Sequence, residues 1–298
     1  MPSAKFNNQI HLHFLVFVAG FTAILGELIS LEAIPLVWYR MVIAGLLMFV
    51  FIKLKGINLS VSPKTLFQFS FAGIIIALHW ITFFASIKVS NISIALAMFS
   101  TGAFFASLIE PIFYKRKIIK YELLFGILVI AGILLIMQTE LQYFLGIILG
   151  ISSALFSSLF AVLNGKFVAR YNASTISFYE FVSGVVFISI FLCFSADGFD
   201  QEFFSLSTSD WGYLFILASI CTAYAFIASV HVMKYITPYS VVLTYNLEPI
   251  YGIVLALILF PESETMSTSF YVGASLIICT LVLNALFKQK KATKSNLD

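Results

Sequence analysis

Long apolar stretches separated by short polar segments are the dominant pattern of this 298-residue chain. Ten such stretches are each about 17 to 24 residues long, enough for a helix to cross ~30 Å of hydrocarbon. They lie near 11–28, 33–54, 66–87, 91–114, 120–138, 142–164, 174–195, 211–233, 238–260 and 268–287. None shows the two-residue alternation of a membrane β-barrel strand. The pattern therefore predicts an all-α membrane protein with ten transmembrane helices.

Composition excludes a soluble domain. The chain is 61% hydrophobic and 10% charged, against roughly 45–50% and about 25% in soluble proteins. Glu27 and Glu32 follow the first stretch where a signal peptide would have small residues at a cleavage site, so we expect this span to be retained. The chain has three cysteines, Cys193, Cys221 and Cys279, and all lie within predicted spans. Their positions exclude a disulfide framework and a CxxC motif.

The basic residues indicate the orientation of the chain. With ten spans and both termini on one side, that side carries fifteen of the 17 Lys and Arg residues. Because basic loops stay in the cytoplasm, both termini are predicted to be cytoplasmic. The lysine clusters would also suit anionic lipid or nucleic acid, but topology explains them and we expect no nucleic-acid partner. The exceptions are Lys88 on the opposite side and Arg40 within a span.

The two halves of the chain resemble each other. Sliding the sequence by 146 residues aligns 85–104 with 231–250, and a shorter match pairs 38–45 with 178–184. Each half holds five spans, an odd number, so the second half enters the membrane in the opposite orientation. This predicts two inverted repeats around a central cavity, an arrangement common in transporters. The expected units are 1–140, 141–287 and a basic cytoplasmic tail at 288–298.

Three charged residues lie well inside predicted spans, away from the span ends: Arg40, Glu180 and Glu248. A charge at the bilayer centre costs about 2.5–3.5 kcal/mol on insertion scales, so these side chains must face protein or water. Two interpretations stay open. They either line a cavity, where they bind a polar group of the cargo or carry a proton, or they form ion pairs and snorkelling contacts that fix helix packing.

A proline follows directly after the carboxylate in the ninth span. Pro249 lacks an N–H, so the carbonyl of Tyr245 loses its helical partner and we expect a kink. Together with Asn246 and Glu248, this carbonyl makes a polar spot that is tolerated only in a cavity or against a neighbour. In the first half, the repeat offset pairs Gly102 with Glu248 and Ala103 with Pro249. We therefore expect Gly102 and Pro249 to be the gating or kink positions.

Aromatic and imidazole side chains add to the candidate site. His79 lies at mid-depth in the third span, where it is either a neutral histidine satisfied by a neighbour or part of a proton relay. Trp80, Tyr179, Tyr224 and Tyr245 are candidates for an aromatic lining of the cavity. Packing between helices is the alternative for each of them.

Other spans are distinguished by small or purely apolar residues. The spans 120–138 and 268–287 carry few polar side chains, so we expect them outside the cavity, against lipid or a second subunit of a homodimer. In the sixth span, small residues recur every four positions and should let another helix approach closely. These are Gly146, Gly150, Ala154 and Ser158.

PLVWYRMVIAG at 35–45 and LEPIYGIVLALILFPESE at 247–264 resemble the drug/metabolite transporter superfamily, EamA family. The matching residues are Pro35 and Arg40 in the second span, and Pro249 and Glu262 in and after the ninth. The first half departs from the family pattern at 102–103 and 115–116. The resemblance covers nearly the whole chain and implies ten helices around a central cavity, with helices 5 and 10 peripheral. It also implies transport of amino acids, nucleotide-like compounds or other small metabolites.

These observations favour a secondary transporter in the cell membrane that exports amino acids or related compounds by alternating access at the repeat interface. The chain has no P-loop, so energy would come from the cargo gradient or from protons carried by His79, Glu180 or Glu248. No cofactor and no metal are expected. An integral-membrane enzyme is disfavoured because no HExxH or GxSxG motif is present. A scaffold or sensor without transport fits the fold but leaves the mid-membrane charges unexplained.

Overall fold

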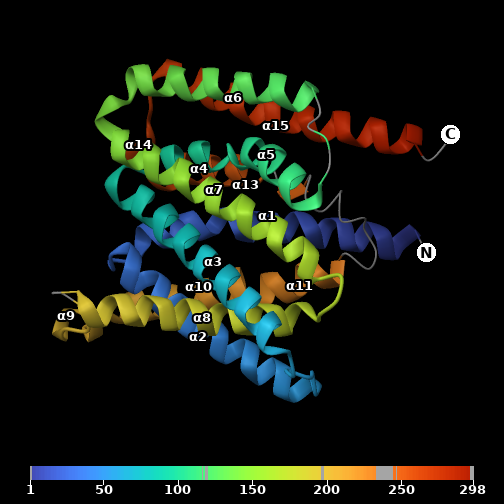
Figure 1. Cartoon of the computed structure of the whole chain (residues 1–298). Helices are drawn as coiled ribbons and strands as arrows, with labels where there is room; N and C mark the ends of the chain where they lie inside the picture. Colours follow the sequence, from blue (N-terminus) through green and yellow to red (C-terminus); the bar gives the residue numbers. More distant parts are fainter. Residues whose placement is uncertain are drawn as a thin grey trace.

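The computed structural model describes residues 2–115, 117, 120–195, 198–232, 244–245 and 247–295, and within these ranges the chain forms helices and no strand (Figure 1). The helices of the first half are α1 (Pro2–Leu28), α2 (Ala33–Lys55), α3 (Pro63–Val89), α4 (Ile92–Phe99), α5 (Gly102–Tyr114) and α6 (Lys120–Thr139). The second half contains η1 (Leu141–Tyr143), α7 (Phe144–Phe167), α8 (Ala173–Phe194), α9 (Gln201–Phe204), α10 (Thr208–Ala218), η2 (Ser219–Tyr224), α11 (Ala225–Val232), α13 (Glu248–Leu259), α14 (Pro261–Glu264) and α15 (Thr268–Ser295).

The helices have the length and apolarity of membrane spans. Seven described segments are long enough to cross a bilayer, namely Asn7–Leu28, Ala33–Lys55, Pro63–Val89, Ile92–Tyr114, Leu141–Phe167, Ala173–Phe194 and Thr208–Ser229. Shorter apolar helices cover the three other predicted spans, at Leu124–Thr139, Glu248–Leu259 and Thr268–Asn284. The all-helical membrane character is confirmed, whereas the crossing of all ten segments stays a prediction.

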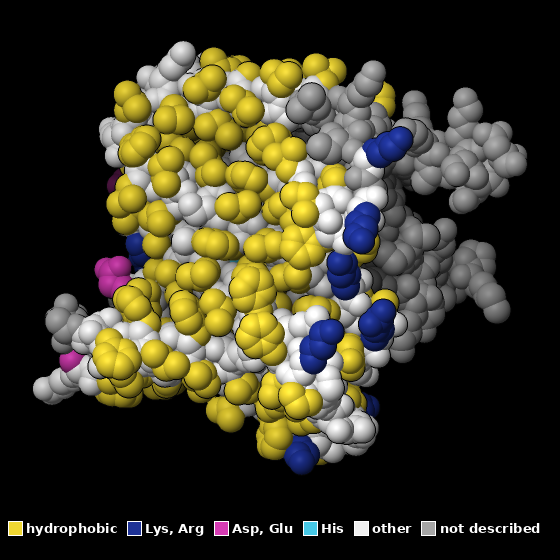
Figure 2. All heavy atoms as spheres, viewed as in Figure 1, with side chains coloured by type: hydrophobic (Ala, Val, Ile, Leu, Met, Phe, Trp, Pro, Cys, Tyr) yellow, Lys and Arg dark blue, Asp and Glu magenta, His cyan; other side chains and the backbone are white. Residues whose placement is uncertain are grey.

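Charged side chains gather at the two ends of the bundle. Both chain termini lie at one end, and most of the visible Lys and Arg side chains gather there (Figures 1 and 2). Helices α9 and α14 lie at the other end, where the visible Asp and Glu side chains and one basic side chain are found (Figures 1 and 2). Between the ends, the visible face is almost entirely hydrophobic (Figure 2). We call the end with the termini the basic end and the end with α9 and α14 the acidic end. This division is what a bilayer across the middle of the bundle requires.

Local sequence signals set several helix ends. Asn91 and Asn172 cap the starts of α4 and α8, each accepting a backbone N–H through its side-chain oxygen. Ser207 and Asp210 form a capping box at the start of α10. Gly56 ends α2 with a φ of 62°, a left-handed conformation that glycine adopts without strain. These short polar signals explain why the apolar stretches break where they do.

The small-residue face of α7 packs closely against the first half. A Cβ on Gly146 would lie 2.4 Å from the Ser90 Oγ of the α3–α4 connection. Further along the same helix, the Ser158 Oγ donates a hydrogen bond of 2.7 Å to the carbonyl of Gly102. The structure thus confirms that the residues spaced every four positions in the sixth span let neighbouring helices approach.

Helices α6 and α15 form a pair at one edge of the bundle (Figure 1). They cross through glycine, since a Cβ on Gly132 would lie 2.9 Å from the carbonyl oxygen of Gly273. Leu124, Ile127 and Leu134 on α6 are exposed. The peripheral placement that the apolar composition predicts is confirmed, and this outer surface suits contact with lipid.

Gly73 lies at a tight crossing of α3 with α8. A Cβ at this position would lie 2.4 Å from the Glu180 carbonyl oxygen, so alanine forces the two backbones apart. We expect Gly73→Ala to destabilise the protein by about 1–3 kcal/mol, because overpacking has costs of this size. The measurement is the thermal unfolding midpoint in detergent.

Gly212→Ala is the matched control. Nothing lies within 4 Å of a Cβ added at this exposed position of α10, so alanine should leave the midpoint unchanged or raise it slightly through helix propensity. Equal midpoints for Gly73→Ala and the parent protein would contradict the close crossing of α3 and α8.

Candidate substrate site

A helix starts at the same repeat position in each half. In the first half α4 ends at Phe99 and α5 begins at Gly102. In the second half α13 begins at Glu248, which is Gly102 shifted by the repeat offset of 146 residues. The expected kink at Pro249 is corrected: this proline lies in the first turn of α13, where its missing N–H breaks no helical hydrogen bond. Interrupted helices at such positions frame the substrate sites of many transporters.

Arg40 of α2 lies near the start of α13 and is 4% exposed. Its Nε donates a hydrogen bond of 2.9 Å to the Thr222 Oγ1. Its guanidinium carbon lies 4.0 Å from the centroid of the Trp80 ring, a cation–π arrangement. The Nη1 atom is buried and has no hydrogen-bond partner among the described residues. The Thr222 hydrogen bond and the Trp80 ring thus hold the guanidinium on one edge and one face. Its Nη1 amino group can still donate hydrogen bonds to a ligand.

Thr222 belongs to η2, a π-helical turn in the eighth span. Its hydroxyl accepts from Arg40 and donates to the carbonyl of Leu217 at 2.7 Å, five residues earlier. Single π turns are rare in helices and frequently occur at functional sites. The amino-acid sequence carries no signal for a π turn, so the residue that positions Arg40 could not be found from it.

Glu248, the first residue of α13, is partly accessible to solvent although it lies at mid-span. Its charge acts electrostatically on Arg40 and on Tyr245. The Tyr245 hydroxyl is in turn 2.6 Å from the Ser229 Oγ. These residues define what we call the central cluster: Arg40, Trp80, Thr222, Tyr245 and Glu248. It combines a buried cation, a half-buried glutamate and two aromatic rings.

His79 and Glu180 make their hydrogen bonds with residues outside the central cluster, although the Arg40 charge also acts on His79. His79 is 8% exposed, and its Nδ1 lies 3.0 Å from the Ser153 carbonyl oxygen and 2.9 Å from the Ser153 Oγ. This geometry matches the interpretation of a buried histidine satisfied by a neighbour. Glu180 is fully buried, with Oε1 accepting from the Asn164 Nδ2 at 2.8 Å and Oε2 without a partner among the described residues.

Two predicted tyrosines and one asparagine also lie elsewhere. The Tyr179 hydroxyl donates to the Leu59 carbonyl at 2.7 Å, in the connection between α2 and α3. Tyr224 is 40% exposed and its hydroxyl lies 2.6 Å from the His11 Nε2 of α1. Asn246 falls outside the described residues. The structure therefore joins four predicted residues, Arg40, Trp80, Tyr245 and Glu248, and not the other aromatic candidates.

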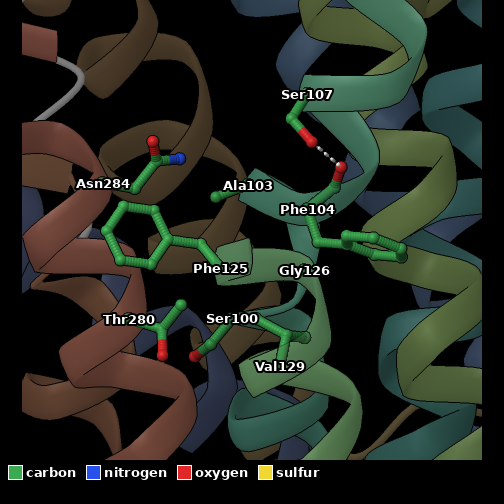
Figure 3. A pocket seen from close by; sticks show the side chains of 9 residues that line it. All are labelled: Ser100, Ala103, Phe104, Ser107, Phe125, Gly126, Val129, Thr280 and Asn284. Carbon is green, nitrogen blue, oxygen red and sulfur yellow. Dashed lines mark hydrogen bonds between the residues drawn. The ribbon is translucent and has the colours of Figure 1, made fainter. Parts of the chain in front are cut away.

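A separate pocket of about 260 Å³, including the open space at its mouth, lies between α5, α6 and α15. Figure 3 shows Asn284 and Thr280 on α15 near Phe125 of α6. The Asn284 Oδ1 is buried without a partner among the described residues, and the rest of the lining is mainly apolar. The pocket shares no residue with the central cluster.

The described residues offer no metal centre, because no group of three or more His, Cys, Asp or Glu side chains among them could hold an ion. What the central cluster offers instead is charge complementarity. A guanidinium with an unused amino group binds a carboxylate or another anion, and a nearby carboxylate binds a cationic group. Chemistry of this kind suits reversible binding of a small polar molecule.

Comparison with known proteins assigns the family. The model of the EamA-like transporter family matches the chain twice, over residues 10–138 and 144–286. The chain belongs to the EamA-like transporter family. The two matches also correspond to the two halves that the repeat in the sequence indicates, and the resemblance drawn from the second and ninth spans is confirmed.

The fold of this EamA-like protein is also found among solved structures, of which 26 chains match. One of them, a crystal structure described only as that of a protein, has 13% sequence identity and a TM-score of 0.64. The alignment covers 95% of this chain and 98% of the other. No curated protein matches the chain. Membership of the family makes the protein a membrane protein of a transporter class, and the solved structure supports the fold alone.

Proposed function

We propose that this EamA-like protein is a secondary transporter that exports amino acids or closely related zwitterions. One observation carries the proposal: Arg40 keeps a buried amino group without a partner among the described residues, and the charge of the half-buried residue Glu248 acts on it. An α-carboxylate would bind the guanidinium of Arg40, and an α-ammonium would bind Glu248. The helix start at Glu248 adds partial positive charge, which also favours the carboxylate.

The site is preorganised on the arginine side. Thr222 holds Nε, and the Trp80 ring covers one face of the guanidinium at 4.0 Å. Both contacts restrict the side chain before cargo arrives, which lowers the entropy cost of binding. Nη1 is the atom that remains for the cargo. Trp80 would also exclude water from the arginine–carboxylate contact and strengthen it.

The proposed arrangement in the membrane follows the charges. The basic end, with both termini, faces the cytoplasm of a cell-membrane protein, and ten helices cross the bilayer. The five-helix units 1–140 and 141–287 are inverted repeats, and the central cluster draws on both, with Arg40 and Trp80 from the first and Glu248 from the second. Relative motion of the two units would expose the cluster to each side in turn.

Proton coupling is placed at Glu248 in this proposal. Unlike Glu180, Glu248 is not fully buried, and unlike His79 it makes no hydrogen bond to a carbonyl among the described residues. A carboxylate that binds either a proton or the cargo ammonium couples the two movements, because the two compete for one group. Proton entry would then drive cargo export.

The experiment is flux into proteoliposomes that contain the purified protein. A mixed pool of labelled amino acids and small metabolites is offered with and without an imposed pH gradient. The proposal expects saturable movement of zwitterionic amino acids that increases with the gradient. Movement of anionic or cationic metabolites alone would contradict the assigned cargo class, and movement of none would favour a scaffold or sensor.

A further inference from the structure

The acidic end of the bundle is joined by a buried carboxylate. Glu264, the last residue of α14, is 1% exposed. Its Oε1 accepts the backbone N–H of Ile92 and its Oε2 accepts that of Ser93, both at 2.8 Å. These are two of the first N–H groups of α4, which the helix itself leaves without partners. One side chain of the second half thus closes the N-terminus of a helix of the first half.

Asn91 at the start of α4 strengthens the same contact, here with a side chain of the first half bonded to the second half. Asn91 caps α4 through its Oδ1 and directs its Nδ2 to the Ser263 carbonyl and the Met266 sulfur, each at 3.2 Å. The connection from α13 to α15 is therefore attached to the start of α4 on both sides of Glu264. Hydrogen bonds to a carboxylate are about twice as strong as neutral ones, so Glu264 dominates this contact.

Two more carboxylates join the halves nearby. The Asp210 Oδ1 accepts the Ser30 N–H at 2.7 Å, and its Oδ2 accepts the Ser30 hydroxyl at 2.8 Å. The Glu140 Oε1 accepts the Ser267 N–H at 3.2 Å. Asp210 also caps its own helix, and Glu140 makes one longer hydrogen bond to the other half. Of these three carboxylates, only Glu264 uses both oxygens solely for hydrogen bonds to the other half.

The repeat does not duplicate this contact. The offset of 146 residues pairs Glu264 with Ile118, whose side chain cannot accept a hydrogen bond. A carboxylate at this position of the repeat is therefore present in only one half. Two inverted repeats would be expected to close the outer and the inner side of the cavity with equivalent contacts. Because only one half has this carboxylate, the closed state of one side is stabilised more than that of the other.

We propose that Glu264 is the latch of the outer gate, and that α14 must separate from the N-terminus of α4 before cargo can leave at the acidic end. The inference rests on the proposed alternating access. Of the two glutamates in α14, only Glu264 is assigned this role, because Glu262 is exposed whereas Glu264 is buried.

The test uses a cysteine that the chain already has. Cys221 is half-buried and adjoins Thr222 of the central cluster. With Cys193→Ser and Cys279→Ser as background, a membrane-impermeant maleimide added outside intact cells modifies Cys221 only through an open outer gate. Glu264→Gln should raise this labelling rate at least about tenfold. The glutamine oxygen can accept one of the two backbone N–H groups, but its NH2 group is a donor and leaves the other N–H without an acceptor.

Glu262→Gln is the matched control and should leave the rate unchanged. Glu264→Asp, which keeps the charge but is too short to reach both N–H groups, should act in the same direction as the glutamine variant and replaces it if that protein does not fold. Conversely, a disulfide between Asn91→Cys and Met266→Cys should reduce outside labelling, and a reductant should restore it. Equal rates for folded Glu264 variants and the parent would overturn the latch.

Labelling requires no cargo, so its result is independent of the flux measurement. Faster labelling in Glu264→Gln without any flux would keep the latch and reject the transport proposal. Flux with unchanged labelling would do the reverse. A rate that rises only when the reagent reaches the basic end would also overturn the assignment of Glu264 to the outer gate.

Discussion

Replacing Arg40 with alanine is expected to abolish saturable transport. The substitution removes the group that would bind the cargo carboxylate and leaves Glu248 without the positive charge that acts on it. Loss of one partner of a buried charged contact costs about 2–5 kcal/mol, so uptake at low cargo concentration should fall at least about thirtyfold. The measurement is the initial rate of labelled amino-acid uptake into proteoliposomes of matched protein content.

Two control variants show whether a loss of transport in Arg40→Ala comes from the binding role of this arginine. Arg40→Lys keeps the charge but loses the planar fork and its stacking on Trp80, so we expect weak transport with a higher KM. Arg170→Ala, which removes an exposed arginine at the basic end, should transport like the parent. If Arg40→Ala transported at the parent rate, Arg40 would serve helix packing alone, the alternative that the sequence left open.

Glu248→Gln should separate cargo binding from proton coupling. The substitution keeps the shape of the side chain, removes its charge and leaves no group that can exchange a proton for an ammonium. We expect uptake to fall about tenfold or more, because a charge-assisted hydrogen bond is lost, and the remaining uptake to ignore an imposed pH gradient. The measurement is the ratio of initial rates with and without that gradient.

The control for this variant is Glu27→Gln, which neutralises an exposed carboxylate and should preserve both rate and pH response. A Glu248→Gln protein that keeps the full response to the gradient would contradict the proton assignment. In that case Glu180, buried with one oxygen unpartnered among the described residues, becomes the stronger candidate.

Much of the fold could be predicted because lipid imposes a simple rule. Every stretch of about twenty apolar residues must be a helix, and the small residues from Gly146 to Ser158 had to be a contact face. The charge distribution predicts both termini on the same, cytoplasmic side; Figure 1 shows both at one end of the bundle, and the cytoplasmic location of that end stays a prediction. These features depend on composition and spacing, which can be read along one chain.

The site was predictable only in part because it depends on contacts between distant segments. Arg40 and Glu248 stand out by their cost in lipid, and the structure brings them together. Thr222 does not stand out, since a threonine in a span is common and no residue pattern marks the π turn that contains it. Tyr179 and Tyr224 were expected in the cavity because of residue type, yet both bond to other partners.

Acidic residues near Pro261 show the same limit. Family resemblance directs attention to Glu262, but the buried contact with α4 belongs to Glu264. Both are charged residues in a short connection, and the sequence alone assigns neither to a partner. Only the position of α4, a helix some 170 residues earlier in the chain, distinguishes them.

Counterflow tests the central claim most directly. Proteoliposomes are loaded with an unlabelled mixture of zwitterionic amino acids, diluted into buffer and given a trace of labelled amino acids outside, with no pH gradient. A carrier that exposes one site to each side in turn should accumulate label transiently above its equilibrium level, and Arg40→Ala should not. Label that only equilibrates, at the same rate with loaded and empty vesicles, would contradict alternating access at the central cluster.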